Sequence, residues 1–228
     1  MFAIMRKIIF LFFFYFVIYP ANAHVEHYQN LNKLVFNLYR NNNFIGTHTY
    51  TFTRKNESLT VLSKIEFAIK KLGIVFYNYR AEGTEVYEEG KLIIFSSKTN
   101  QNKKEKFVDM SIKNNKYLIN GSSYKGYVPL DYVIGTWWNH AIVSAEAQIS
   151  AVSGRIIKQK VEFLGKETIQ IGNQSIESLH FNFTSSDKKL DKDKKLNTHI
   201  WYDSKTLNWI KAKFKKNGTW EYRLKSIE

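Results

Sequence analysis

The sequence predicts a mainly β protein, built as a single large curved antiparallel sheet with one short helix near residues 139–150. Three observations predict this class. Apolar and polar residues alternate from Leu34 onward, asparagine and glycine separate the alternating runs, and Tyr, Phe, Ile, Val and Thr are abundant. The runs amount to about eleven or twelve strands joined as a meander. A sheet of that size curls into a barrel or half-barrel.

The chain begins with the three parts of a secretory signal peptide, residues 1–23. Arg6 and Lys7 supply the positive start, residues 8–19 are apolar, and the small residues Ala21 and Ala23 predict cleavage after Ala23. The apolar run is too short for a membrane-spanning helix, which needs about twenty residues. We therefore expect a soluble periplasmic or secreted protein, with residues 24–228 forming a single β-barrel-like domain.

Charge and cysteine content narrow the possible partners. The sequence has no cysteine, which excludes disulfides and lipid attachment at an N-terminal cysteine. The formal net charge is +14, and removing Arg6 and Lys7 with the signal leaves 14 − 2, or +12. Lysines fall on alternate positions of predicted strands, which is typical of a solvated face. We expect no nucleic-acid partner in an exported protein, while a peripheral contact with an anionic membrane surface is compatible with this charge.

The alternating runs define the strands, and residues that tolerate a positive φ define the turns between them. Turn signals occur at residues 41–43, 55–57, 89–90, 114–115, 165–166, 172–173 and 217–218. The run at residues 73–89 is apolar on both faces in its first half, so we expect one face in the core and the other covered or lining a cavity. Its acidic residues are expected at the surface: Glu82, Glu85, Glu88 and Glu89.

The motif GTWWNHA, residues 135–141, concentrates rare residue types. Adjacent side chains cannot share a face, so Trp137 and Trp138 must point in different directions, one into the core and one toward a rim or cavity mouth. Asn139 is a natural cap for the predicted helix. The motif is therefore either a packing corner or an aromatic wall for a lipid, sugar or quinone, with His140 beside it.

A second aromatic cluster, Trp201-Tyr202-Asp203, begins a terminal three-strand meander. Asp203 opens a turn, where a carboxylate usually caps backbone amides. The candidate ligand-binding residues of the two motifs are Trp137, Trp138, Asn139, His140, Trp201, Tyr202 and Asp203.

Established catalytic motifs are missing. The sequence has no GxSxG, no HExxH and no glycine-rich phosphate loop. The charged stretch at residues 185–197 lacks the glycine and glutamate of a calcium loop, which favours a solvated loop. Cleavage after Ala23 would make His24 the N-terminal residue, which could chelate copper through its amino group and ring nitrogen. The polar segment before the first strand is more typical of an ordinary chain terminus, so we expect no cofactor.

Four stretches resemble, in order, a family of exported proteobacterial β-proteins known as a domain of unknown function: residues 87–110, 135–141, 153–181 and 201–224. The resemblance runs from about residue 34 to residue 224 and implies a signal peptide and a curved antiparallel sheet. It implies no activity and transfers no catalytic residue. The family has a glycine in the loop after Thr99, where this chain has Asn102 and Lys103. More loosely, the layout is similar to half-barrel carriers of lipids and lipoproteins in the bacterial envelope.

Three functions remain open. The first is non-enzymatic binding of an apolar or amphipathic, lipid-like envelope molecule on the concave aromatic face. The second is an envelope enzyme acting on glycan or lipid, with His140 and a carboxylate such as Asp131 or Asp203 near Trp137. The third is a structural or protein-binding module, which an exposed apolar patch would indicate.

Overall fold

The computed structural model describes residues 28–191 and 194–228. Its strands are β1 (Lys33–Arg40), β2 (Asn43–Lys55), β3 (Ser58–Lys71), β4 (Ile74–Glu88), β5 (Lys91–Gln101), β6 (Lys104–Lys113), β7 (Lys116–Gly121), β8 (Lys125–Val128), β9 (Val133–Ile134), β10 (Ala147–Ile149), β11 (Ile156–Ile171), β12 (Gln174–Ser185), β13 (Asn197–Asp203), β14 (Trp209–Lys215) and β15 (Thr219–Ile227).

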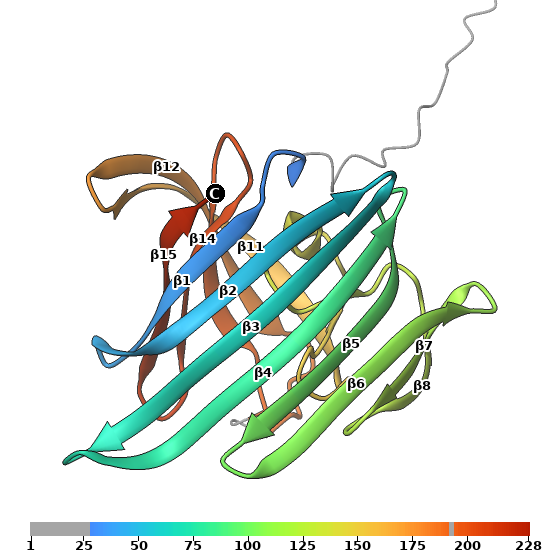
Figure 1. The fold of residues 1–228 in the computed structure, drawn as a ribbon, viewed down its shortest axis with the longest axis horizontal. Helices are drawn as coiled ribbons and strands as arrows, with labels where there is room; N and C mark the ends of the chain where they lie inside the picture. The colour runs from blue at the N-terminus through green and yellow to red at the C-terminus, as the bar shows by residue number, and fades with distance from the viewer. Residues whose placement is uncertain (1–27, 192–193) are drawn as a thin grey trace, which may run out of the picture.

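All of these strands form one curved, open sheet, in the order β8-β7-β6-β5-β4-β3-β2-β1-β15-β14-β13-β12-β11-β10-β9. The strands from β1 to β8 form one half and those from β9 to β15 the other, and the halves face each other (Figure 1). This confirms the predicted mainly β class and the single curved sheet. The sheet has 15 strands, more than predicted, because β8, β9 and β10 are too short to show an alternating pattern.

Neighbouring strands pair antiparallel throughout, except that β9 and β10 pair parallel. The two halves join where β1 pairs with β15, from Leu34 opposite Ile227 to Arg40 opposite Trp220. The strands β13, β14 and β15 form the predicted terminal meander. Most strands pair with the next strand in the chain, as short turns favour; the exceptions are the β1–β15 pair and the consecutive strands β8 and β9, which lie at opposite edges of the sheet.

Most of the predicted turns are confirmed by backbone geometry. Positive φ values occur at Asn41, Asn56, Glu89, Asn114, Gly172 and Asn217, all in turns between paired strands. Asn102 and Lys103 also have positive φ and close the β5–β6 turn without a glycine. The predicted turn at residues 165–166 is wrong: Gly165 lies inside β11, where the register shifts at a bulge. A bulge needs the same permissive backbone as a turn, so the sequence signal is shared.

The predicted helix near residues 139–150 is also wrong in extent. Only a four-residue 3-10 helix forms, His140–Val143. Ala147–Ile149 instead becomes strand β10, hydrogen-bonded to β11 and to β9. Pairing with two neighbouring strands outweighs the local helix preference of the alanines.

The core lies on the inner, concave face of the sheet. Its largest fully buried side chains are aromatic and come from both halves, including Tyr50, Trp138, Tyr202 and Trp209. The long strand β4 departs from the expectation that both of its faces are covered. Ile74, Val75 and Phe76 at its start are exposed, because β4 extends beyond the end of β5, whose Gln101 lies opposite Tyr79.

Across the described residues, no helix has the length and apolar character needed to cross a bilayer. The predicted signal peptide, its cleavage point and His24 lie outside the described residues.

Candidate functional site

The GTWWNHA motif lies over the concave face and is tied to both halves of the sheet. The Tyr50 hydroxyl on β2 donates a 2.6 Å hydrogen bond to the carbonyl oxygen of Thr136. The Tyr202 hydroxyl on β13 donates a 2.9 Å hydrogen bond to the carbonyl oxygen of Trp137. The centre of the concave face is therefore filled by the protein's own loop.

Trp138 is the tryptophan that enters the core. It is fully buried, and its ring meets the rings of Tyr28, Phe52 and Tyr87 edge to face at centroid separations of 5.2 to 5.7 Å. Its indole Nε1 donates a 2.8 Å hydrogen bond to Oε1 of Glu85 on β4. This satisfies the polar edge that a buried tryptophan carries into an apolar core.

Glu85 is buried beneath the motif, with 1% of its surface exposed. It also accepts hydrogen bonds from the hydroxyls of Tyr87, at 2.5 Å, and Thr136, at 3.0 Å. Burial raises the pKa of the Glu85 carboxyl, while these donors and Trp138 act in the opposite direction. The expectation that Glu85 lies at the surface is wrong, because it shares the inward face of β4 with Tyr79 and Tyr87.

Trp137 points away from Trp138, as the geometry of adjacent residues requires. Its backbone has a φ of 61°, a conformation that a bulky side chain rarely adopts. The half-buried ring packs edge to face against Trp209, Tyr222 and Phe214, at centroid separations of 5.5, 5.6 and 6.4 Å. Trp137 thus completes an aromatic cluster with β14 and β15.

Asn139 and His140 have structural contacts. Asn139 is the N-cap of the 3-10 helix, and its Oδ1 accepts a 3.0 Å hydrogen bond from the amide of Ala141, which confirms the predicted cap. The His140 amide donates to the Tyr28 hydroxyl at 3.0 Å. The His140 ring meets Tyr202 and Phe181 edge to face, with ring centroids 4.8 and 6.0 Å apart.

Trp201 lies on the opposite face of β13 from Tyr202, in an outer cluster. Glu167 accepts hydrogen bonds there from Trp201 Nε1 at 3.0 Å and approaches Nδ1 of His180 at 2.6 Å. His180 Nε2 in turn lies 2.9 Å from Nδ1 of His199. The indole and imidazole hydrogen bonds lower the pKa of Glu167 against the effect of its desolvation. The Nζ of Lys211 lies 4.7 Å from the centre of the Trp201 ring.

Asp203 caps its turn, as the sequence predicts. Its Oδ1 accepts hydrogen bonds from the amides of Lys205, at 2.7 Å, and Thr206, at 3.0 Å. The seven candidate residues therefore do not form one site. Tyr202 contacts the loop that carries Trp137, Trp138, Asn139 and His140, whereas Trp201 lies in the outer cluster and Asp203 caps a turn.

An apolar pocket of about 420 Å³ lies beside the motif, at the end of the sheet that carries the β4–β5 and β6–β7 turns. We call it the apolar pocket; it is lined by Tyr87, Gly90, Lys91, Leu92, Ile112, Tyr117, Leu130, Asp131, Tyr132, Val133, Ile134, Asn139 and Ala141. Asn139 and Asp131 thus share this pocket. Burial raises the pKa of Tyr117 in its wall to about 12, so that hydroxyl is neutral at ordinary pH.

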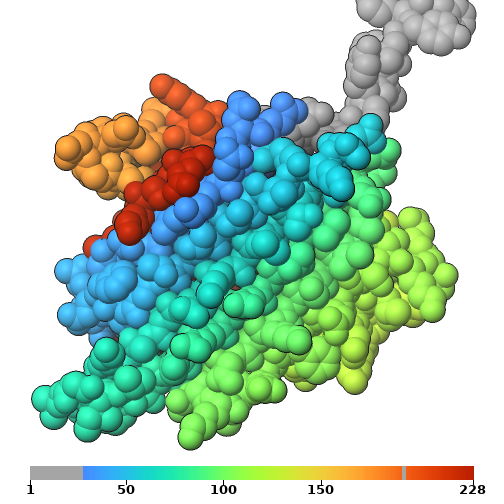
Figure 2. All heavy atoms as spheres, viewed as in Figure 1, coloured from blue at the N-terminus to red at the C-terminus, as the bar shows by residue number. Residues whose placement is uncertain are grey.

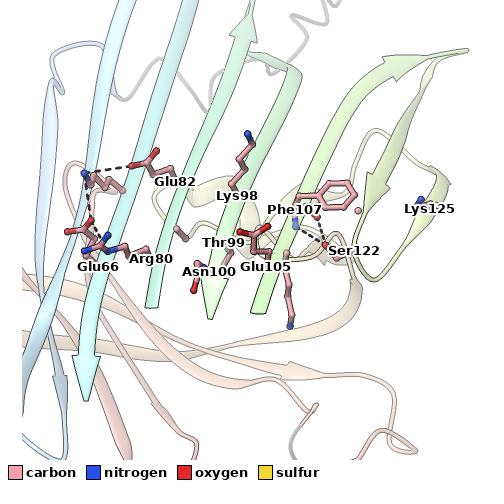
Figure 3. A pocket seen from close by; sticks show the side chains of 14 residues that line it. Glu66, Arg80, Glu82, Lys98, Thr99, Asn100, Glu105, Phe107, Ser122 and Lys125 are labelled. Atoms are coloured by element: carbon pink, nitrogen blue, oxygen red, sulfur yellow. Dashed lines mark hydrogen bonds and ion pairs between the residues drawn. The ribbon is translucent and has the colours of Figure 1, made fainter. Parts of the chain in front are cut away.

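A larger hollow of about 1080 Å³, the outer groove, crosses strands β3 to β7 on the outer face (Figure 3). Charged side chains of both signs dominate its lining. Lys64 Nζ lies 3.7 Å from Glu82 Oε1, and Arg80 Nε lies 3.6 Å from Glu66 Oε1. The lining has five basic and three acidic side chains, and these exposed ion pairs offset part of the positive charge.

Sequence reasoning missed Glu85, Tyr87 and the pocket-lining residues of β5 to β7. Glu85 could have been found from the alternation of β4, because it falls on the same face as Tyr79 and Tyr87. The pocket could not, because it depends on which loop covers those strands. Within the described residues, no three His, Cys, Asp or Glu side chains are placed to hold a metal ion.

Comparisons with known proteins define the family and the fold. The model of DUF6134, a domain of unknown function, matches residues 36–225. A β-barrel-like protein of the domain of unknown function DUF1849 from Brucella abortus has a similar structure, with a TM-score of 0.57 and 9% identity over 87% of this chain and 98% of that chain. A protein with a YmcC-like fold from Bacteroides fragilis gives a TM-score of 0.39 and 8% identity over 86% of this chain and 94% of that chain. Among curated proteins, none matches this chain.

Proposed function

This chain belongs to the DUF6134 family, and we propose that it is an exported binding protein that holds an apolar or amphipathic, lipid-like molecule in the apolar pocket. The observation that carries the proposal is a concave site of about 420 Å³ with mainly apolar walls, the size and character of small-molecule sites in general.

The walls and rim of the pocket suit an amphipathic ligand. Leu92, Ile112 and Val133 supply apolar surface, which favours an acyl chain or a comparable apolar body. Lys91, Asp131 and Asn139 supply polar groups to orient a head group. The hydrogen bonds from Tyr202 and Tyr50 hold the GTWWNHA motif, which we call the covering loop, in place over the sheet. The pocket beside it therefore exists before a ligand binds.

A fluorescent acyl probe, dansyl-undecanoic acid, tests the proposal. Its emission should rise and shift to shorter wavelength on binding the purified protein. The variant Ile112→Trp fills the pocket and should weaken the apparent affinity about tenfold. The matched control is Ile94→Trp, since Ile94 is 46% exposed on the outer face of β5 and lies outside the pocket lining; it should bind the probe as the wild type does.

An unchanged probe spectrum with the wild type, or equal affinity in Ile112→Trp and the wild type, would overturn the proposal. Native mass spectrometry of protein prepared from the bacterial envelope gives an independent measurement. We expect a co-purified lipid-like mass, which Ile112→Trp should lose.

A further inference from the structure

The β3–β4 hairpin ends in a tip that is exposed and apolar. Every residue from Lys70 to Phe76 is exposed. Leu72 is 93% exposed, Ile74 65%, Val75 49% and Phe76 59%. We call residues 70–76 the hairpin tip. Soluble proteins expose single apolar side chains freely, but four within five residues at the end of a projecting hairpin indicate a contact surface.

The hairpin tip projects beyond its neighbours on both sides. β5 ends opposite Tyr79, so residues 74–77 have no partner on that side, and β2 pairs with β3 only as far as Phe67, opposite Gly46. The tip forms the lower-left corner of the molecule (Figure 2). Leu72 occupies the turn with a φ of 53°, where asparagine or glycine would be less strained. The chain thus carries a large apolar side chain at a position that disfavours it.

The base of the hairpin tip is rigid. Phe67 stacks on Tyr79, with ring centroids 4.8 Å apart and planes 9° apart, and meets Trp220 of β15 edge to face at 5.3 Å. This aromatic stack links the hairpin to the opposite half of the sheet. The apolar tip is therefore presented from a fixed support.

Basic residues surround the hairpin tip. Lys70 and Lys71 belong to it, and the turns at the same end of the sheet add further cations. In the turns β1–β2, β3–β4, β5–β6 and β14–β15 these cations are Arg40, Lys70, Lys71, Lys103, Lys104, Lys215 and Lys216, with Glu105 as the acidic residue among them. The β12–β13 loop at the same end carries charges of both signs: Asp187, Lys188, Lys189, Asp191, Lys194 and Lys195. The opposite end also has acidic residues, as in the β4–β5 turn Glu88-Glu89-Gly90-Lys91, beside the basic β6–β7 turn with Lys113 and Lys116.

A cleft of about 390 Å³ lies next to the hairpin tip, between the β1–β2 turn and β3. Arg40 and Lys70 line it, together with Phe44, which is itself 59% exposed. Cations beside an apolar surface match the chemistry of an anionic lipid, whose phosphate lies next to its acyl chains.

We propose that the hairpin tip docks this protein onto an anionic membrane surface. Leu72, Ile74 and Phe76 enter the boundary between head groups and acyl chains, and Lys70, Lys71 and Arg40 contact the phosphates. The apolar pocket lies at the other end of β4, about 45 Å away at the usual rise of a strand. The docking therefore stands independently of the pocket and leaves it facing away from the bilayer.

Vesicle flotation tests the docking. The purified protein should float with vesicles of phosphatidylglycerol and phosphatidylcholine, and about tenfold less with phosphatidylcholine alone. The variant Leu72→Asn with Phe76→Ser should lower partitioning about tenfold. Its control, Leu62→Asn with Ile94→Ser, makes the same kinds of change at two outer-face apolar residues that are 48% and 46% exposed, against 93% for Leu72 and 59% for Phe76, and should float as the wild type does.

A second pair of variants tests the contribution of positive charge. It compares two lysines before the β3–β4 turn with two lysines that flank the β6–β7 turn. Lys70→Gln with Lys71→Gln should weaken flotation and reduce its salt dependence, whereas Lys113→Gln with Lys116→Gln at the opposite end should not. Failure of the wild type to float would overturn the proposal. Flotation of the Leu72→Asn, Phe76→Ser variant equal to that of the wild type would also overturn it. A third contrary result is a wild type that is a dimer on size exclusion and a variant that is a monomer, with no difference in flotation. None of these results depends on probe binding in the apolar pocket.

Discussion

The indole nitrogen of Trp138 donates a 2.8 Å hydrogen bond to the carboxylate of Glu85, and both residues are buried. This bond attaches the covering loop to the floor of the sheet. The same carboxylate accepts from Thr136 of that loop and from Tyr87 of β4. One acidic side chain therefore holds two residues of the GTWWNHA motif, Thr136 and Trp138, against β4.

Replacing Glu85 with alanine should destabilise the protein by about 3 to 5 kcal/mol, because three buried donors lose their acceptor. Urea unfolding followed by tryptophan fluorescence measures the change. Glu85→Gln keeps an acceptor oxygen and should lower the free energy of unfolding by less. A loss for Glu85→Ala no larger than that for Glu85→Gln would contradict the role of the carboxylate as the anchor.

The pH dependence of Glu85 has a definite sign. Burial raises the pKa of its carboxyl above the ordinary 4.5, so the folded protein binds a proton that the unfolded chain binds less tightly. This contribution to stability is complete below pH 4.5 and is lost as the pH rises through the folded pKa. The free energy of unfolding of the wild type, relative to Glu85→Gln, should therefore increase as the pH is lowered from 7 to 5. A constant difference would count against a raised pKa.

His48 should give the opposite pH dependence. It is buried against the rings of Tyr50, Trp209 and Tyr222, and desolvation lowers its pKa to about 3. Its stabilising contribution is complete above pH 6.5 and is lost as the pH falls, because only the unfolded chain takes up the proton. Between pH 7 and 5 the wild type should lose about 2 kcal/mol relative to His48→Asn. Unfolding curves of both proteins at the two pH values test this; parallel behaviour would refute it.

The two tryptophans of the motif should differ in their contribution to stability. Trp138→Ala should cost about 3 to 5 kcal/mol, since it removes a fully buried ring and one of the three hydrogen-bond donors to Glu85. Trp137→Ala should cost less, about 1 to 3 kcal/mol, because its ring is only half-buried. Chemical denaturation of both variants gives the comparison, and a larger loss for Trp137→Ala would reverse the assignment.

Gly46 of β2 should tolerate no side chain. A Cβ atom there would lie 2.1 Å from the carbonyl oxygen of Glu66 and 2.6 Å from the Cα of Phe67. Gly46→Ala should therefore destabilise the protein by about 3 kcal/mol through displacement of β3. Gly83→Ala on β4 is the control, because its nearest neighbour would lie at 3.6 Å, and it should leave the melting temperature nearly unchanged.

The sequence predicted what depends on local periodicity. Inward residues such as Val61 and Phe183 follow from alternation, and Asn139 and Asp203 follow from the need of backbone amides for acceptors. The strand at Ala147–Ile149 could not be predicted from local periodicity, because its pairing with β9 and β11 is set by the tertiary fold. Glu85 was assigned by residue type, although its parity placed it inside. The pocket was inaccessible to sequence reasoning because a distant loop forms one of its walls.

The pairing of β1 with β15 has a consequence for how the chain is made. Most strands pair with the next strand in the chain, and β1 pairs with β2 in this way on one edge, but its other edge has no partner until residues 219–227 are synthesised. Until that strand is synthesised, β1 keeps an open edge with Leu34, Phe36 and Leu38 on its apolar side. Contacts of such sequence separation form slowly, and an open edge invites association with other chains. The last strand therefore closes the sheet, and until it is made the open edge of β1 can pair with another chain.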